Sequence, residues 1–332
     1  MGLFRNSCFK LLYKLKLGNY FLFKNRRKSQ IPVLVFHKII PEYDQIWPGI
    51  HPRLFEDIII LLKKHYKILP LSDLYLRPES ELKDACFLTF DDGYKDFLDY
   101  AYPILKKHNI HSTLFVLPND ITNRGHIWTS TIIFFVKHYS YNEIDEFFRK
   151  REVVIYYSDL FDGFKLNLDI TACLCEMQQM ERAALIKELQ EKFIADNRVV
   201  QNELLSFEEL RKLDPSIVTI ASHSLTHPSF RQELDEEFIN YELKESKAII
   251  EKELNTDVKA FAFPFAKYNG ISYGIMKQVY RICFTKINEP INLKRIKTDK
   301  EYIYDLPRYN IHHDSAEEVF FLINGLHKKL GK

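Results

Sequence analysis

Short apolar runs alternate along the chain with longer segments in which apolar residues recur every three or four positions. The first run, 31–37, is rich in valine and isoleucine, which is typical of a buried strand, and Pro52 opens a segment of helical period that ends near Tyr66. Further strand-like runs lie at 67–71, 85–90, 111–116, 217–221, 259–263, 281–284 and 304–309. Strands that alternate with helices favour parallel β/α units, so we predict an α/β fold, an incomplete or distorted (β/α) barrel of about seven strands.

The alternation loosens between residues 123 and 202, and we interpret this stretch as a helical insertion in a barrel domain of residues 31–332. The elements expected inside it are an aromatic-rich segment at 128–141, helices at 141–149 and 177–195, and a strand at 153–157. Outside it, helices are expected at 95–108, 206–213 and 235–254, and from residues 270 and 315 onward.

Residues 1–30 form a basic, apolar N-terminal arm that holds no Asp or Glu. Its basic side chains are Arg5, Lys10, Lys14, Lys16, Lys24, Arg26, Arg27 and Lys28. Because lysines interrupt the apolar stretch every few residues, a secretory signal is disfavoured, and we expect a location in the cytoplasm or at the inner face of the membrane. One interpretation of the arm is an amphipathic anchor that makes peripheral contact with an anionic membrane. The other is a helix that packs on the domain, or a frayed basic arm.

Composition narrows the class of protein. Of 332 residues, 46% are hydrophobic and 28% are charged, which is ordinary for a globular protein and excludes wholesale disorder. The sequence contains no apolar run long enough for a transmembrane helix, and its five cysteines are too few for a disulfide framework. The net charge is +2, but without the basic arm it is −6, so we expect no nucleic-acid partner.

Polar side chains follow four of the predicted strands. His37 follows the first strand, Asp91-Asp92-Gly93 follows the run at 85–90, Ser222-His223-Ser224-Leu225-Thr226-His227 follows the run at 217–221, and Pro264-Phe265 follows the run at 259–263. Each cluster alone is also typical of a turn, a helix cap or a rim histidine. Because the carboxyl ends of barrel strands meet at one mouth, we expect the four clusters to converge.

Together these clusters fit one kind of chemistry. Two imidazoles and a carboxylate make a three-ligand metal site with open positions. Such a metal acidifies bound water and polarises a carbonyl group. A second carboxylate beside it can act as a general base, and a further histidine can protonate a leaving nitrogen.

Three motifs resemble those of the NodB-type polysaccharide deacetylases, carbohydrate esterase family four. Thr89-Phe90-Asp91-Asp92-Gly93-Tyr94 resembles the first motif of the family, and 222–227 resembles the second. Phe261-Ala262-Phe263-Pro264-Phe265 is similar to the third, in the form found in the poly-N-acetylglucosamine deacetylase branch. The resemblance spans about residues 31–310 and implies a hydrolase that removes N-acetyl groups from a glycan.

The resemblance also implies a role for each matching residue. Asp91 is the expected general base, and Asp92, His223 and His227 are the expected ligands of one divalent metal ion, for which zinc is usual. The backbone N–H of Phe265 is expected to help hold the oxyanion. His37 is expected to be the general acid, as in the same branch, and Arg308, in a late Leu-Pro-Arg segment, is expected to orient or neutralise Asp91 unless it lies on the surface.

Several alternatives stay open at this point. His312 and His313 follow a predicted strand and are rival acids, as is His327 near the C-terminus. Ala262 and Ala266 depart from the family pattern, where an arginine and a glycine are common, and this puts the shape of the substrate cleft in question. The aromatic residues of the insertion either line a sugar cleft or belong to the core; they include Trp128, Phe134, Phe135, Tyr139 and Tyr141.

The substrate and the reaction also have alternatives. The glycan is either a polymer or a lipid-linked sugar precursor. Two other functions compete with de-N-acetylation: hydrolysis of another C–N bond, in a cyclic amide or ureide, and glycan binding without catalysis.

Overall fold

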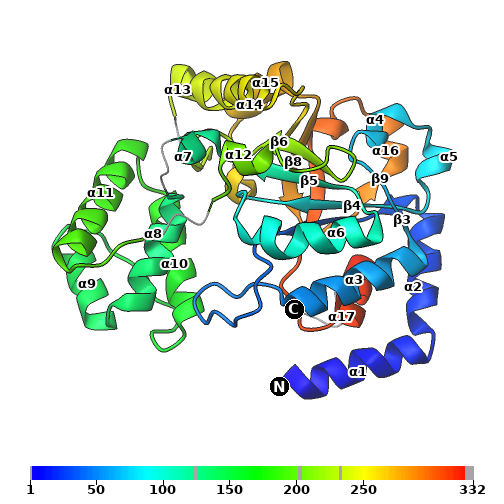
Figure 1. Ribbon diagram of the computed structural model, residues 1–332, viewed down its shortest axis with the longest axis horizontal. Coiled ribbons are helices and arrows are strands. Elements are labelled where there is room, and N and C mark those ends of the chain that lie inside the picture. The colour runs from blue at the N-terminus through cyan, green and yellow to red at the C-terminus, as the bar shows by residue number, and fades with distance from the viewer. Residues whose placement is uncertain (1, 123–125, 201–203, 232–233, 326–332) are drawn as a thin grey trace.

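Seven parallel strands close into a barrel in the computed structural model of the chain, which describes residues 2–122, 126–200, 204–231 and 234–325 (Figure 1). Around the barrel the strands are β2 (Val33–Phe36), β10 (Leu306–Asn310), β8 (Ile282–Ile287), β7 (Ala260–Ala262), β6 (Val218–Ser222), β5 (Ser112–Val116) and β4 (Ala85–Phe90). Strand β4 pairs back with β2 and so closes the ring, while β3 (Lys67–Ile68) adds an eighth strand beside β4. The predicted seven-stranded (β/α) barrel is therefore confirmed.

The two strands that close the ring are buried on both faces. Every residue of β2 and β4 is buried, as parallel strands covered by helices require. The pairing places Val33 opposite Phe87 and Phe36 opposite Phe90, so the two strands end at the same level. On the other side of β10, the register with β8 shifts between Leu306 and Pro307, because proline has no N–H to donate to the ladder.

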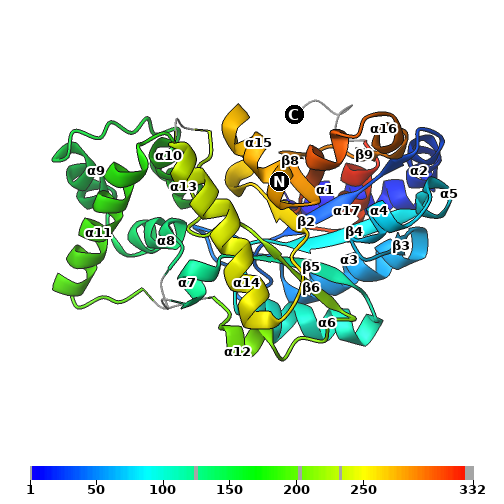
Figure 2. The ribbon, with the colours of Figure 1, turned by 90° about the horizontal axis from the view of Figure 1, so that it is seen from above.

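Helices cover the outside of the barrel (Figure 2). They are α3 (Pro52–His65), α6 (Tyr102–His108), α14 (Ser246–Leu254), α15 (Gly270–Val279) and α17 (Ala316–Ile323), with the shorter α4 (Asp73–Leu76), α5 (Glu79–Leu82), α12 (Phe207–Leu210), α13 (Glu236–Asn240) and α16 (Leu293–Thr298). Two expected long helices contain a π-helical turn: Phe97–Ala101 precedes α6, and Tyr241–Glu245 joins α13 to α14. A short antiparallel pair, β1 (Gln30–Ile31) with β9 (Ile291–Asn292), lies outside the barrel sheet.

The helical insertion stands to one side of the barrel, at the left of Figure 1. Beyond α7 (Pro118–Thr122), it consists of α8 (Trp128–His138), α9 (Tyr141–Arg149), α10 (Gly163–Cys175) and α11 (Gln179–Ala195). These four helices share a hydrophobic cluster of their own, in which Trp128, Phe135 and Tyr139 are buried. The aromatic residues of 128–141 therefore contribute mainly to a core.

The strand expected at 153–157 is wrong. This segment has no regular structure, and Val154 and Tyr156 are 67% and 88% exposed. Its run of β-branched and aromatic residues is typical of a strand, but no strand among the described residues pairs with it, and an unpaired strand leaves its backbone groups without partners.

The N-terminal arm forms two helices, α1 (Gly2–Lys14) and α2 (Leu17–Arg27). One face of the pair packs on the barrel: the ring of Phe9 lies 5.7 Å from that of Phe321 in α17, and Leu22 is buried. Gly18 allows this approach, because a Cβ atom there would come within 2.6 Å of the Phe320 ring. Among the described residues, no helix is both long enough and apolar enough to cross a bilayer.

Candidate active site

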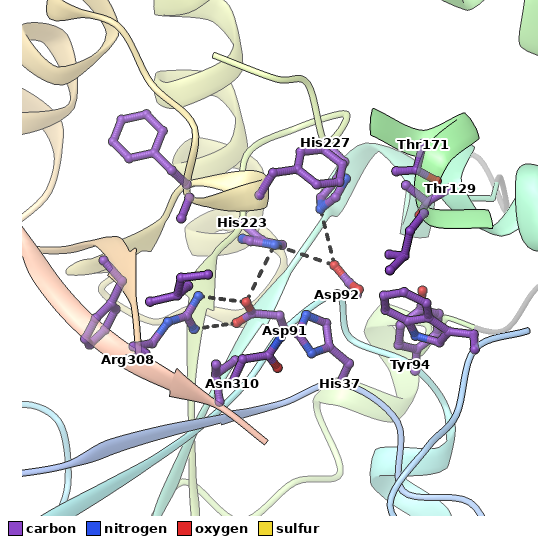
Figure 3. A pocket seen from close by; sticks show the side chains of 18 of the residues that line it. His37, Asp91, Asp92, Tyr94, Thr129, Thr171, His223, His227, Arg308 and Asn310 are labelled. Carbon is purple, nitrogen blue, oxygen red and sulfur yellow. Dashed lines mark hydrogen bonds and ion pairs between the residues drawn. The ribbon is translucent and has the colours of Figure 1, made fainter. Parts of the chain in front are cut away.

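A cavity of about 220 Å³ opens where the carboxyl ends of the barrel strands meet the insertion. The seven site residues expected from the sequence all line it: His37, Asp91, Asp92, His223, His227, Phe265 and Arg308. Figure 3 shows Asp91 and Asp92 between His223 and His37, with Arg308 on one side and Thr129 and Thr171 on the other. The structure thus gathers residues that lie up to 271 positions apart in the sequence.

Asp91 and Asp92 are directed into the cavity by a sharp turn at the end of β4. Asp92 has φ 73° and Gly93 has φ 77°, so both lie in the left-handed region. At Gly93 a side chain would be strained, and its Cβ atom would lie 3.0 Å from Cγ1 of Val116. The turn therefore requires glycine after the aspartate pair.

His223 and His227 come from the loop after β6, which is held by hydrogen bonds to the side chains of Ser224 and Glu242. Ser224 and His227 have left-handed backbones, and the N–H of His227 donates to Oγ of Ser224 at 3.1 Å. The buried carboxylate of Glu242 accepts from the N–H groups of Leu225 and Thr226 at 2.9 and 3.0 Å and from the hydroxyl of Thr226. The loop is thus fixed between the two histidines.

Asp92, His223 and His227 fit a divalent metal ion. One ligand atom from each lies within 4.8 Å of the other two, and Nε2 of either histidine is 3.5 Å from Oδ1 of Asp92. Within the described part of the chain, Oδ1 of Asp92 is buried without a hydrogen-bond partner. The Nδ1 of His223 lies 2.8 Å from the carbonyl oxygen of Ala262, which leaves Nε2 free to ligate, the arrangement usual behind metal-bound histidines.

Charge in the cavity also favours a cation. Burial, followed by the nearby Asp91 carboxylate, raises the pKa of Asp92 to about 8. Burial lowers the pKa of His223 to about 4, and burial also lowers that of His227 well below its ordinary value. Both imidazoles are therefore neutral near pH 7, as ligands must be, and a divalent ion would stabilise the charged form of Asp92.

Arg308 lies against Asp91 rather than on the surface. It reaches inward from β10, and its guanidinium donates to both carboxylate oxygens at 2.7 Å. It also donates to Oγ1 of Thr89 at 3.2 Å, and both residues of the ion pair are buried. Burial by itself would raise the pKa of Asp91, but Arg308 outweighs it and holds that pKa well below its usual range.

His37 lines the same cavity, at the end of β2. Its ring makes an edge contact with Trp47 at 6.2 Å, and burial lowers its pKa although Asp91 acts in the opposite direction. His312 lines a neighbouring cavity instead, together with His37. His313 is described by the structure and lines neither of these two cavities. His327 lies outside the described residues.

Phe265 follows β7 in a strained turn. Its φ is 59° and that of Ala266 is 53°, so the position where the family commonly has glycine is left-handed here as well. The Phe265 ring lies 4.7 Å from that of His227 and 5.7 Å from that of Trp128. Nε1 of Trp128 in turn donates to the carbonyl oxygen of His227 at 2.9 Å, which connects the insertion to the loop that holds both histidines.

Sequence reasoning missed Glu242, and it named aromatic residues of the insertion rather than the residues of the insertion that line the cavity. Glu242 lies three residues from Ile239 and one from Leu243, both fully buried. A charged residue on the apolar face of the predicted helix was therefore the pattern that could have revealed it. Thr129, Ile133, Asn167, Leu168 and Thr171 from α8 and α10 line the cavity. No local pattern reveals that these helices cover the barrel mouth.

Comparisons with known proteins agree with this geometry. The family profile described as Polysaccharide deacetylase matches residues 79–138 and 187–280, which hold all three motifs. YxkH of Bacillus subtilis (strain 168), whose name assigns it provisionally to the polysaccharide deacetylases, is 27% identical over 114 residues. That match covers 31% of this chain and 38% of the relative, so the chain matches well under half of it.

Solved structures show the same fold. The Streptococcus pyogenes deacetylase PplD, in complex with acetate, has a TM-score of 0.57 at 18% identity, over 89% of this chain and 98% of the other. IcaB from Ammonifex degensii has a TM-score of 0.54 at 15% identity, over 89% and 97%. The barrel, with its polar site at the strand ends, is the fold that these solved structures share. In its three motifs the chain matches the polysaccharide deacetylase family.

Proposed function

We propose that this protein is a metal-dependent hydrolase that removes N-acetyl groups from N-acetylhexosamine units of a glycan. One observation carries the proposal: Asp92, His223 and His227 gather at one cavity with Asp91 beside them. A protein that only binds glycans has no need of a second carboxylate next to the ligand set. The match to the polysaccharide deacetylase family supports a glycan as substrate.

In the proposed reaction, Asp91 accepts the proton of the attacking water. Arg308 keeps Asp91 ionised, and it also makes Asp91 a weak base that takes a proton only from an acidified water. A divalent ion held by Asp92, His223 and His227 would supply that chemistry, since it acidifies water and polarises the acetyl carbonyl. The N–H of Phe265 would then face the developing oxyanion.

His37 would give its proton to the leaving nitrogen of the sugar. It lines the cavity together with Asp91, so acid and base reach one bound amide. Because burial lowers the pKa of His37, its protonated form is a stronger acid than a solvated imidazolium. The products are acetate and the free amino sugar.

Acetate release from N-acetylglucosamine oligomers tests the function. We expect release that stops with a chelator and returns on addition of Zn²⁺. His37→Gln should lower kcat by about 100-fold or more, in the usual range for a general acid, whereas His312→Gln should stay within about twofold. Release that ignores the chelator would contradict the metal mechanism, and equal loss in both variants would contradict the choice of His37.

We also propose that α1 and α2 bind the surface of an anionic membrane. The face of these helices that does not pack on the barrel exposes large apolar side chains: Leu11, Leu15, Leu17, Tyr20 and Phe23 are 44–62% exposed. Lysines and arginines flank them, and each contributes about 1 kcal/mol near an anionic leaflet. Such contact suits an enzyme at the inner face of the membrane that acts on a lipid-linked sugar.

Sedimentation with vesicles tests this contact. We expect the protein to bind vesicles that contain phosphatidylserine, to bind less as salt is raised, and not to bind pure phosphatidylcholine. Leu11→Ser combined with Leu15→Ser should abolish binding. The matched control is Val154→Ser combined with Tyr156→Ser, which removes exposed apolar groups from the insertion. Equal binding of both double variants would contradict the proposal.

A further inference from the structure

The wall of the cavity opposite Arg308 belongs to the insertion. Thr129 of α8 and Thr171 of α10 lie across Asp92 from Arg308 (Figure 3). Residues 139–186, which include all of α10, fall outside the residues that the family profile matches. The barrel side of the cavity thus carries the family motifs, while α10 supplies surface from a segment that the profile does not cover.

Asn167 of α10 is an unusual residue in this wall. It lines the cavity and is only 2% exposed. Its Oδ1 atom is buried and finds no hydrogen-bond partner among the described residues. A buried amide oxygen without a partner costs about 1–3 kcal/mol, so native proteins seldom keep one unless a ligand or water donates to it.

The position of Asn167 on its helix sharpens the contrast. Its neighbours Leu166 and Ile170 are buried in the apolar cluster of the insertion, where the amide of an asparagine would find no hydrogen-bond partner. Thr171, one helical turn further on, lies on the same face and also lines the cavity. Polar groups on α10 therefore gather on the side that faces the metal-ligand residues.

We propose that Asn167 is a specificity-determining residue whose carboxamide hydrogen-bonds a hydroxyl group of the sugar that carries the acetamido group. The inference rests on the proposed function and deepens it, because it assigns recognition of the sugar ring to the insertion. A carboxamide offers both a donor and an acceptor, which suits a sugar hydroxyl. The ring is held between α10 and the barrel motifs, with its acetamido group toward Asp92.

Asn167→Leu distinguishes recognition from a structural role. Because Oδ1 of Asn167 has no protein partner among the residues that the structure describes, replacement of the side chain by a similar apolar group should leave the free energy of unfolding unchanged or raise it. Loss of one hydrogen bond to the substrate should instead raise KM for the N-acetylglucosamine trimer by about 3- to 10-fold. Substrate affinity is therefore expected to fall while the free energy of unfolding does not.

Thr131→Val is the matched control. Thr131 lies in α8 and is fully buried, and its hydroxyl likewise finds no partner among the described residues, but it does not line the cavity. Its replacement should also leave stability unchanged or raised, with KM unaltered. An equal rise of KM in both variants would overturn the inference, since packing of the insertion would then explain it.

Trimers that lack a single hydroxyl of the reacting sugar identify the contact. For one deoxy analogue, the KM of the wild type should rise by the same factor as the KM of Asn167→Leu rises with the full trimer. The variant should have the same KM for this analogue and for the full trimer. If every analogue lost equal factors in both proteins, the inference would be wrong while the proposed function stood. If the wild type bound the trimer without releasing acetate, the proposed function would fail, and the ratio of Kd values would still decide the role of Asn167. Absence of binding would overturn both.

Discussion

Arg308 holds the carboxylate of Asp91 with two parallel hydrogen bonds of 2.7 Å, one to each oxygen, inside a buried site. The guanidinium also lies 5.0 Å from the centre of the Phe284 ring and 5.3 Å from that of Phe115, so aromatic faces enclose the pair. This geometry fixes the orientation of Asp91 toward His223, whose Nε2 is 3.8 Å away. Two parallel hydrogen bonds require the planar guanidinium of an arginine, and the ammonium group of a lysine cannot form them.

Arg308→Met should therefore raise the pKa of Asp91. In the wild type that pKa lies well below its usual range, so ionised Asp91 contributes stability above the ordinary carboxyl pKa, and this is lost only as pH falls through the lowered value. Without Arg308 the acidic limb of kcat/KM should move to higher pH, and stability should fall by about 3–5 kcal/mol. Arg295→Met, which breaks an exposed pair with Asp299, is the control and should change stability by under about 1 kcal/mol. An unmoved acidic limb would show that Asp91 is not the base.

Metal binding should release a proton from Asp92. With a pKa of about 8, Asp92 is mostly protonated in the metal-free protein at pH 7, whereas His223, at about 4, is neutral. We expect Asp92 to release most of a proton per Zn²⁺ bound at pH 7 and much less at pH 9. Calorimetry in buffers of different ionisation enthalpy measures this number.

Asp91→Asn is an informative variant for that experiment. The Asp91 carboxylate is the second cause of the raised pKa of Asp92, after burial. Its removal should leave Zn²⁺ bound but reduce the number of protons released at pH 7. Release that is the same at pH 7 and pH 9 in the wild type would show that Asp92 is ionised before the metal binds.

The sequence was informative where local pattern and strand topology determine the outcome. A buried run that ends in Asp91-Asp92-Gly93 places both carboxylates at the barrel mouth, whatever the rest of the chain does. The role of Glu242 depends on a helix that packs behind the loop of His223, which no local pattern encodes. The place of Asn167 in the cavity could not be predicted for the same reason, because the orientation of α10 over the barrel mouth depends on tertiary packing. The strand predicted at 153–157 was wrong because a high β-propensity does not supply a neighbouring strand.

Glu242→Leu should weaken the metal site, although Glu242 is not one of the proposed ligands. One carboxylate oxygen accepts from the N–H groups of both Leu225 and Thr226, and leucine would leave these two groups without that acceptor. We expect a 10- to 100-fold loss of Zn²⁺ affinity, as for other residues that orient metal ligands. Glu245→Leu, on the exposed side of the same π-helical turn, is the control and should keep the wild-type Kd. Equal Kd values for all three proteins would contradict a positioning role for Glu242.

Ala266→Gly should stabilise the protein. Ala266 has φ 53°, and a left-handed backbone costs an L-residue with a side chain roughly 1–2 kcal/mol, whereas glycine adopts it freely. After the greater flexibility of glycine in the unfolded chain is subtracted, we expect a gain of about 0.5–1 kcal/mol in the free energy of unfolding by urea. Ala248→Gly, at an exposed position within α14, should lose about the same amount. Since the two substitutions are chemically identical, opposite signs would isolate the backbone strain at the third motif, and a loss in both would show that the turn at Ala266 carries none.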